Sequence, residues 1–371
     1  MTRDSSSQRI VRLTSLDTVL ALIEAQVGAV TQRVCAPAQA FGATLAQDVV
    51  TSARPPHPIA LRDGYAVEAL TIADAGPYAP VAFATAPRRV EAGDMLPPQT
   101  DAVTPLDAVT LRGDRAEAIT AIAPGEGVLP AGDDVNSHTP ILRAGQRLRA
   151  LDVAVLAAAG VTEVTVRVPR LRLACGSMAK SPVIDAALTW LARLVEIAGG
   201  AVVGAESSLT AALADDKADA VIAVGGTGSG RNDNAVLTLA EHGRVEAHGI
   251  AISPGDTAAF GFAGARPVLL IPGRLDAALA IWLLLGRFLV AQLAGGRIEE
   301  NPALVPLKRK ITSTIGMTEV IPVRWSEGMA EPLGSGYLSF AMLTQSNAFV
   351  VVPPDSEGFA AATPIVVRAW P

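Results

Sequence analysis

The sequence is short of cysteine and histidine, which excludes several classes of site. Its 371 residues include two cysteines, Cys35 and Cys175, too few for a disulfide framework or a CxxC metal site. A reducing, cytoplasmic setting is therefore expected. The four histidines have no ligand spacing: His57, His138, His242 and His248. The sequence also has no HExxH and no GxSxG segment, so zinc hydrolases and nucleophile-elbow hydrolases are excluded.

Positive charge is also scarce. The chain carries 30 lysines and arginines against 36 acidic residues, a net charge of −6, and no lysine- or arginine-rich run compensates for it. We therefore expect neither a nucleic-acid partner nor a basic helix that lies on a membrane. The basic residues are nearly all arginine, and the lysines are Lys180, Lys217, Lys308 and Lys310.

One long apolar run, Ala277–Ala294, is of borderline length for a membrane span. Arg287 inside the run would cost about 3 kcal/mol on insertion into a bilayer. Asp276 precedes the run and Gly295-Gly296 ends it, which is the pattern of a capped helix. We therefore expect a helix buried in a large domain and no membrane partner.

The patterning of the chain predicts several domains. Half of the residues are hydrophobic and 18% are charged, so about two to four cores are expected at this length. A helix is expected from Ser15, and residues 60–128 consist of short apolar pieces broken by Gly, Pro and Asp. Residues 169–294 alternate strands with helices, which predicts a mainly parallel sheet covered on both faces. Residues 1–13 lack the apolar core of a signal peptide and are expected to be a frayed tail.

The predicted fold class is a multidomain α/β protein. A central, mainly parallel three-layer α/β domain carries a β-rich inserted module, an N-terminal helical segment and a small C-terminal β-barrel. The expected boundaries are 1–54 plus 130–165 for an elongated helical linker domain, 55–129 for the β-rich module, 166–300 for the α/β domain and 301–371 for the barrel.

Within the α/β domain the elements alternate along the chain. The predicted strands are 171–175, 201–207, 219–226, 244–252 and 266–271. The predicted helices are 182–200, 208–218, 232–242 and the long apolar run. Ligands of such sheets bind beyond the carboxyl ends of the strands, so the segments that follow the strands are the candidate sites.

The segment AVIAVGGTGSGRND, 220–233, places four glycines among the six residues that follow a strand. It does not fit the dinucleotide fingerprint, because Arg231 stands where the third glycine is needed, and it lacks the Lys-Ser/Thr pair of a P-loop. Small residues still let backbone N–H groups approach an anion at the start of helix 232–242. Two interpretations remain open from this segment alone, an anion-binding loop and a flexible strand-to-helix turn.

Other turns extend this pattern. Pro254-Gly255 and Pro272-Gly273 each follow a strand, and three glycine turns at one sheet edge could line one crevice. In LRDGYAVEA, Asp63-Gly64 forms either a tight hairpin or a rigid turn that presents the Asp63 carboxylate to a cation or a proton.

The order of six motifs resembles one family. DGYAV, PAGDDVN, LAAAGVTEVTV, GGTGSGRND, SPGD and IPGR follow one another as in the molybdopterin molybdenumtransferases, the MoeA and gephyrin E-domain group. The likeness runs from about residue 15 to the end. It implies that residues 166–300 bind molybdopterin, that molybdate is inserted into adenylylated molybdopterin with Mg²⁺ and release of AMP, and that the chain forms a homodimer serving a molybdoenzyme client.

The resemblance also assigns site residues. Asp63 and Asp233 are the expected catalytic residues, and Asp63, Asp134 and Asp233 the expected Mg²⁺ ligands. The expected substrate-binding residues are Gly176, Ser177, Gly225, Gly226, Thr227, Gly228, Ser229, Gly230, Pro254, Gly255, Pro272, Gly273 and Arg274. The resemblance places this site between the α/β domain of one subunit and the DGYAV module of the other.

The chain departs from the family pattern at several charged positions. Ser177-Met178 replaces an acidic pair, Ala92-Gly93 lacks the family's threonine, and Ser253 and Asp256 replace two lysines, while Arg274 replaces the Asn of Pro-Gly-Asn-Pro. These changes cancel in net charge, so we hypothesise that a phosphate is held by Arg274, with Lys180 as a second cation. The lost acidic pair leaves an alternative open: a non-catalytic molybdopterin-binding carrier or chaperone without insertase activity.

Overall fold

The computed structural model describes residues 8–113, 115–177, 181–206, 208–298 and 300–371, which fold into two compact units. The large unit contains the chain up to residue 47 together with 144–153 and 163–371. The small unit contains 48–143 and 154–162. The multidomain α/β class is confirmed, while the division into four domains stays a prediction.

A six-stranded sheet forms the centre of the large unit, in the order β13-β12-β14-β18-β17-β15. Its strands are β12 Arg170–Cys175, β13 Ala201–Glu206, β14 Ala220–Val224, β15 Arg244–His248, β17 Ala259–Ala263 and β18 Arg266–Ile271. The pairs from β13 to β18 are parallel, whereas β17 is antiparallel to both β18 and β15. The sequence analysis missed β17, whose AFGFA segment is short and apolar throughout and therefore has no alternating pattern.

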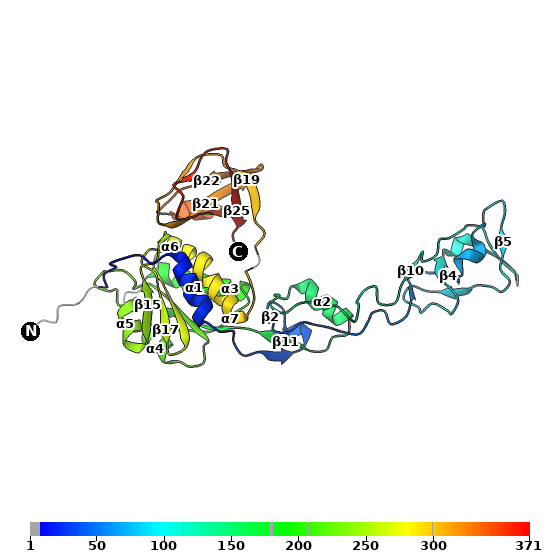
Figure 1. Ribbon diagram of the computed structural model, residues 1–371, viewed down its shortest axis with the longest axis horizontal. Helices are drawn as coiled ribbons and strands as arrows, with labels where there is room; N and C mark the ends of the chain where they lie inside the picture. The colour runs from blue at the N-terminus through cyan, green and yellow to red at the C-terminus, as the bar shows by residue number, and fades with distance from the viewer. Residues whose placement is uncertain (1–7, 114, 178–180, 207, 299) are drawn as a thin grey trace, which may run out of the picture. The chain divides into compact units, whose positions relative to one another are not determined.

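Helices cover both faces of this sheet (Figure 1). The helices are α1 Leu16–Gln26, α3 Pro182–Ile197, α4 Leu209–Ala214, α5 Ala235–His242, α6 Leu275–Ile281 and α7 Arg287–Ala294. Alternate residues of β14 face opposite cores: Ile222 packs in the core with α1, α3 and α6–α7, and Val221 packs in the core with α4 and α5. This alternation produces three layers and leaves the carboxyl ends of the strands as the open edge.

The expected buried apolar helix is present. A π-helical turn, η4 Trp282–Gly286, joins α6 to α7, and the helix ends at Gly295 in the left-handed conformation. By length and composition Leu275–Ala294 could cross a membrane, but 72% of it is buried inside the fold. Core helices of soluble proteins pass the same test, so this is weak evidence for a span.

The small unit is rich in short strands, as predicted. They are β3 Ile59–Ala60, β4 Gly64–Val67, β5 Val81–Ala82, β6 Arg88–Val90, β7 Ala102–Thr104, β8 Val109–Arg112, β9 Arg115–Ala118 and β10 Val128–Leu129. The hairpin interpretation of Asp63-Gly64 is wrong, because β3 pairs with β10 while β4 pairs with β6 and β7. A Cβ on Gly64 would lie 2.2 Å from the Thr104 carbonyl oxygen, so this close approach requires glycine.

The large unit also contains a three-stranded sheet of β1 Arg33–Cys35, β2 Thr44–Leu45 and β11 Val164–Arg167. Helix α2, Ala150–Ala158, precedes β11, and its residues from 154 on belong to the small unit. The expectation of a frayed tail is wrong for residues 8–13: the Gln8 side chain is buried, and Thr14 donates its N–H to the Gly249 carbonyl. The side chains of Ile10 and Leu13 lie against Gly249, so apolar contact also holds this segment.

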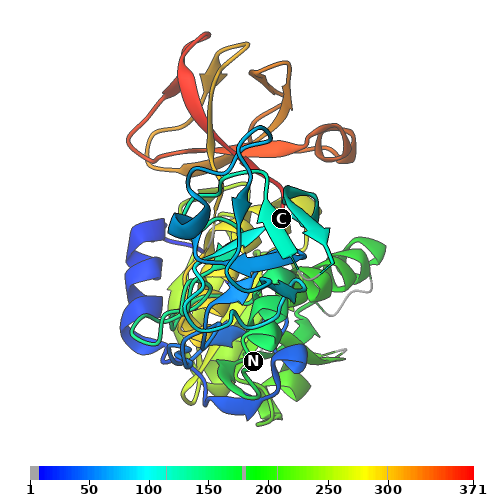
Figure 2. The ribbon, with the colours of Figure 1, turned by 90° about the vertical axis from the view of Figure 1, so that its right-hand side faces the viewer.

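The C-terminal strands form a sheet of their own, coloured orange to red in Figure 2. Its order is β16-β21-β23-β25-β19, and β22 also pairs with β21. The bounds are β16 Ile252–Ser253, β19 Ala303–Pro306, β21 Thr318–Ser326, β22 Met329–Pro332, β23 Ala348–Val352 and β25 Pro364–Ala369, with β20 Ile311–Thr312 paired to β24 Gly358–Phe359 and α8 Phe340–Gln345 nearby. A bridge from Leu307 to Ala330 supports closure, and the barrel stays a prediction.

The predicted strand 244–252 is divided between two sheets. Its first part, β15, is the edge strand of the central sheet, whereas Ile252 and Ser253 form β16 and pair with β21. The Gly249 backbone, at a φ of +84°, makes the turn between the two parts. The segment that leads to Pro254-Gly255 therefore belongs to the C-terminal sheet.

Candidate functional site

Three glycine turns meet at the carboxyl edge of the central sheet. Gly176 follows β12, Gly225 and Gly226 follow β14, and Gly273 follows β18. A Cβ on Gly226 would lie 2.2 Å from the Gly176 carbonyl oxygen, and one on Gly273 would lie 3.4 Å from the Gly225 Cα. These turns are packed backbone against backbone. The expected crevice also included the Pro254-Gly255 turn, and it stays a prediction.

The Pro254-Gly255 turn is linked to the same cluster through side chains. The hydroxyls of Thr227 and Thr257 lie 3.0 Å apart, and Nε2 of His248 lies 3.1 Å from the Thr227 carbonyl oxygen. Thr227 is 2% exposed, so its hydroxyl serves this link and is closed to a bulky ligand.

The backbone donors of the glycine loop divide into two groups. Gly176 and Gly225 donate their N–H groups to Val224 and Ile271, which closes the strand ends. Among the described residues, the N–H groups of Gly226, Thr227, Gly228 and Ser229 have no backbone acceptor. Gly226 and Thr227 are buried, Gly228 is half-buried and Ser229 is exposed, so the N–H groups of Gly228 and Ser229 are the ones that an anion can reach.

The start of α5 does not supply the anion site that the sequence pattern suggested. The Gln8 side-chain oxygen accepts the N–H groups of Val236 at 2.7 Å and Leu237 at 3.0 Å, the donors that an anion at this helix end would use. The Gln8 amide nitrogen donates to the carbonyls of Gly226 and Gly228 at 3.0 and 2.8 Å. Gln8 therefore joins the glycine loop to α5, and no local sequence pattern could have identified a cap that lies 228 residues away.

Asp233 holds the far end of the loop. Its Oδ2 atom accepts the Gly230 N–H at 2.9 Å, its own N–H donates to the Gly230 carbonyl, and a β-bridge joins it to Ser177. The carboxylate therefore orders the loop, and its other oxygen is the atom that can face a cation. Ser229, by contrast, is exposed at the tip of the loop.

A cavity of about 620 Å³ opens beside these turns, between the ends of β12 and β13 and helices α3, α4 and α5. Its described lining contains five hydroxyls, two carboxylates and one amide, but no lysine or arginine. The polar lining residues are Ser177, Ser181, Asp185, Glu206, Ser208, Thr210, Asn234 and Thr238. Of the predicted substrate-binding residues, only Gly176 and Ser177 line it.

The two carboxylates were missed by the sequence analysis. Asp185 is exposed in the first turn of α3, where the helix dipole favours a negative charge. Glu206 ends β13 and accepts a hydrogen bond from Arg172 at 3.1 Å. The cavity thus presents hydrogen-bond acceptors, while the loop beside it presents hydrogen-bond donors.

Arg274 is paired within the fold. Its guanidinium donates to both carboxylate oxygens of the buried Asp276 and lies 4.8 Å from the centre of the Tyr337 ring. The hydrogen bonds that Arg274 donates to Asp276 raise the pKa of its guanidinium above the usual value. The charge count that assigned a phosphate to Arg274 left out Asp276, and the Arg274 assignment stays a prediction. Lys180 and Met178 lie outside the described residues.

The predicted residues of the small unit lie on turns. The Asp63 carboxylate is exposed and accepts the Ala92 N–H at 2.9 Å, while the exposed Asp134 donates its N–H to the Arg54 carbonyl. Within the described part of the chain, no group of three or more His, Cys, Asp or Glu side chains is placed to hold a metal ion. The Mg²⁺ ligand set of Asp63, Asp134 and Asp233 therefore stays a prediction.

Comparisons with known families cover most of the chain. A family model described as the MoeA N-terminal region (domain I and II) matches residues 14–160. One described as a probable molybdopterin binding domain matches 177–292, the segment that holds the glycine turns. One described as the MoeA C-terminal region (domain IV) matches 305–369.

Individual relatives are distant but extensive. A molybdopterin molybdenumtransferase of Haemophilus influenzae is 24% identical over 349 residues, which cover 83% of this chain and 86% of the relative. Molybdopterin molybdenumtransferase 1 of Mycobacterium tuberculosis is 26% identical over 310 residues, covering 72% and 70%. The crystal structure of a molybdopterin biosynthesis MoeA protein from Pyrococcus horikoshii has the same fold, with a TM-score of 0.80 at 24% identity over 97% of this chain and 100% of that one.

Proposed function

The chain belongs to the MoeA family of molybdenum-cofactor biosynthesis, and from this premise we propose that it inserts molybdate into adenylylated molybdopterin and releases AMP. The observation that carries the proposal is the meeting of three glycine turns beside a polar cavity. One side of the site donates hydrogen bonds and the other accepts them. Adenylylated molybdopterin needs both, because it combines phosphates with a nitrogen-rich ring.

The cavity suits the pterin. A pterin carries an amino group and ring N–H donors on one edge, and Asp185 and Glu206 can accept from them. The phosphates belong at the N–H groups of Gly228 and Ser229, outside the cavity and away from its carboxylates. In this arrangement the acidic chain holds an anionic substrate through backbone dipoles, which carry no net charge.

Mg²⁺ completes the proposed reaction. Asp233 borders the phosphate-binding loop and can reach a cation bound to a phosphate oxygen. Asp63 and Asp134 belong to the other unit of the chain, and in a homodimer the partner subunit's Asp63 and the partner subunit's Asp134 would complete the site. The metal would stabilise charge on the phosphate as the bond to AMP breaks.

A carrier or chaperone that binds molybdopterin without turnover is the second candidate. The residues at 177 and 178 are not an acidic pair, and Arg274 is already engaged by Asp276. Each lost charged hydrogen bond costs roughly 1.5–3 kcal/mol, so two or three such losses would leave binding with little catalysis.

AMP release separates the two candidates. The purified chain is incubated with adenylylated molybdopterin, Mg²⁺ and molybdate, and AMP is followed over time. Turnover supports insertion, and tight binding without AMP supports the carrier. Removal of Mg²⁺ with a chelator is expected to stop AMP release while binding persists, whereas unchanged turnover would contradict the metal's role.

Variants test the assignment of the cavity and of Arg274. Asp185→Asn is expected to weaken substrate binding about tenfold, because one charged acceptor is lost. Glu196→Gln lies on the same helix outside the cavity and is the matched control. Arg274→Ala is expected to weaken AMP binding if its outer guanidinium face reaches the phosphate, and an unchanged affinity would refute this role.

A further inference from the structure

A second cavity, of about 310 Å³, lies elsewhere in the large unit and shares no lining residue with the first. It is lined by the end of α3, the long helix, Arg147, residues 297, 298, 300 and 301, and residues 368–371. Its volume corresponds to about ten water molecules, enough for a ligand of similar atom count. The proposed reaction makes no use of this cavity.

Four arginines line the second cavity, and Glu300 is the one acidic side chain among the lining residues that the structure describes. The arginines are Arg147, Arg287, Arg297 and Arg368. Glu300 accepts from Arg287 at 3.4 Å and from Arg368 at 2.6 Å, so one carboxylate serves two guanidiniums. Arg147 is fixed by a hydrogen bond from its Nε to the Gly42 carbonyl. The lining therefore keeps an excess of positive charge in a chain whose total charge is −6.

Burial raises the electrostatic strength of this cluster. The Arg287 side chain is only 15% exposed, and its burial lowers the pKa of the guanidinium. Like charges held together in a partly buried place repel one another unless an anion compensates them. In a fully exposed cluster of arginines this repulsion would be small, because water and salt screen the charges.

A buried donor adjoins the same space. Trp282 lines the cavity, and its indole Nε1 is buried with no acceptor among the residues that the structure describes. An unpaired buried N–H costs about 1–3 kcal/mol. Trp282 also begins the π-helical turn. Such turns are rare in proteins, and those that occur are often found at functional sites.

Apart from Asn301, the rest of the described lining is apolar. Leu194, Ile197, Ala291, Ile298 and Trp370 form the walls between the charged groups. Trp370 is held in place by stacking on Phe349 and by its indole N–H, which donates to the Ser346 hydroxyl. A ligand in the cavity would therefore meet a flat aromatic wall as well as guanidinium donors.

We propose that this cavity binds a small molecule that carries a phosphate or carboxylate on a flat apolar body. Arg287, Arg297 and Arg368 receive the oxyanion through guanidinium donors, and the apolar body lies among Leu194, Ile197 and Trp370. The Trp282 N–H faces the bound oxygen atoms. This site is separate from the molybdopterin site in both residues and ligand chemistry.

Tryptophan indole signals report on the proposed site directly. The full chain is labelled with ¹⁵N-tryptophan, its four indole signals are assigned by single Trp→Phe variants, and phenyl phosphate and benzoate are titrated separately. The indole signals of Trp282 and Trp370 are expected to shift with saturation, and that of Trp325 to stay constant. The two probes distinguish a phosphate from a carboxylate ligand, and phenol, which lacks the anion, is expected to bind at least tenfold more weakly.

Arginine variants test the cause of the shifts. Arg297→Gln is expected to weaken the better probe about three- to tenfold, because an exposed guanidinium contributes less than a buried one. Arg193→Gln, an exposed arginine on α3 outside the cavity, is expected to change nothing. The proposal is overturned if neither probe shifts Trp282 at millimolar concentration, or if Arg297→Gln and Arg193→Gln bind alike. A failure of AMP release would leave this result untouched.

Discussion

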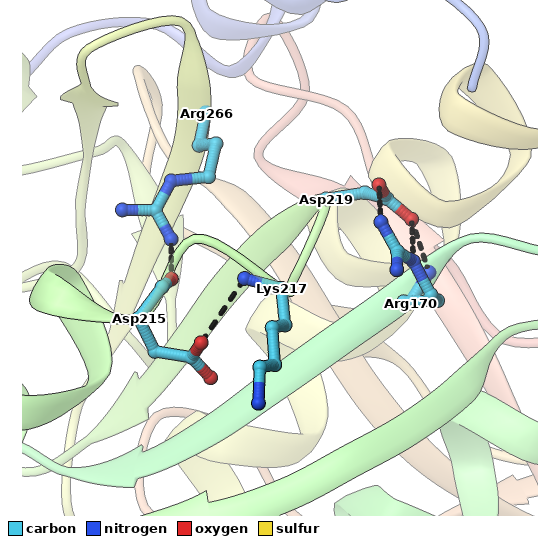
Figure 3. Close-up of polar contacts among 5 residues, drawn as sticks. All are labelled: Arg170, Asp215, Lys217, Asp219 and Arg266. Atoms are coloured by element: carbon cyan, nitrogen blue, oxygen red, sulfur yellow. Dashed lines mark hydrogen bonds and ion pairs between the residues drawn. The ribbon is translucent and has the colours of Figure 1, made fainter. Parts of the chain in front are cut away.

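The two edges of the central sheet are built from different chemistry. At the edge where β12, β14 and β18 begin, the Arg170 side chain is paired with Asp219, and the Arg266 side chain donates to a carbonyl group (Figure 3). At the edge where the same strands end, the turns are made of glycine, and several backbone donors have no backbone acceptor among the described residues.

At the edge where the strands begin, the two arginines are held by hydrogen bonds within the fold. Arg170 and Asp219 exchange backbone and side-chain hydrogen bonds, and this pairing raises the pKa of Arg170 above its usual value. The Arg266 guanidinium donates to the carbonyls of Leu213 and Asp215 at the end of α4. The backbone N–H of Lys217 donates to the Asp215 carboxylate. Groups satisfied in this way stabilise the loops and leave little for a ligand. In this sheet, polar groups without a hydrogen-bond partner therefore mark the binding edge better than charged side chains do.

The largest loss of stability is expected from a substitution at the edge where the strands end. Gly226→Ala puts a Cβ 2.2 Å from the Gly176 carbonyl oxygen, on a residue whose φ is +72°. The left-handed conformation costs about 1–2 kcal/mol and the overlap adds about 1–3 kcal/mol, so the free energy of unfolding should fall by about 3 kcal/mol. Urea denaturation measures this loss, and binding of adenylylated molybdopterin is expected to disappear with it.

Gly264→Ala is the matched control, at the turn that leads into β18 on the starting edge. Its φ is +63°, but no atom lies within 4 Å of the added Cβ. Only the conformational cost of about 1 kcal/mol is expected, with substrate affinity retained. Equal losses in the two variants would mean that the edges do not differ as described.

The second largest loss of stability is expected from a substitution of Gln8, which joins the glycine loop to α5. Gln8→Ala removes four hydrogen bonds and leaves two donors of α5 and two loop carbonyls without their partner. We expect the free energy of unfolding to fall by about 2 kcal/mol. Faster hydrogen exchange at the Val236 and Leu237 amides would locate the loss, and the exposed Gln39→Ala should stay within about 0.5 kcal/mol of the parent. A Gln8→Ala chain as stable as the parent would show that water replaces this cap.

The smallest effect is expected at the starting edge. Asp219→Asn weakens an ion pair whose arginine side chain is 52% exposed, so about 1 kcal/mol of stability should be lost. The loss should shrink in high salt, since exposed pairs are screened. Substrate affinity should not change, and an affinity loss comparable to that of Asp185→Asn would contradict a purely structural role.

The sequence predicted the scaffold of the site better than its chemistry. Strand ends and glycine turns carry strong local signals, and Gly225 and Gly273 do follow neighbouring strands of the central sheet. The third expected turn, Pro254-Gly255, follows a strand of the C-terminal sheet instead. Asp185 looks like any acidic residue in a first helical turn, and only the fold brings it to the cavity. Gln8 was missed for the same reason, because its partners lie far along the chain.

The errors in the fold also have physical causes. The strand predicted over 244–252 begins with polar and apolar residues in alternation and ends with apolar ones, but Gly249 turns the chain, and Ile252 pairs in another sheet. Periodicity reports burial, and it does not say which sheet buries a residue. The Asp63-Gly64 pair was open to a hairpin interpretation because local sequence cannot reveal that Gly64 touches the Thr104 carbonyl.

The π-helical turn lets the long helix accommodate one residue more than a regular α-helix would. A regular α-helix rotates by about 100° per residue, and a π turn accommodates about one residue more than an α turn. Deleting one residue within Trp282–Gly286 would restore the regular helix without shortening it by a full turn. Because the π turn already accommodates the extra residue, the deletion would leave Arg287 and the rest of α7 close to their present orientation. A single codon lost or gained here would thus change the local backbone beside Trp282 while the arginine-lined cavity kept its walls.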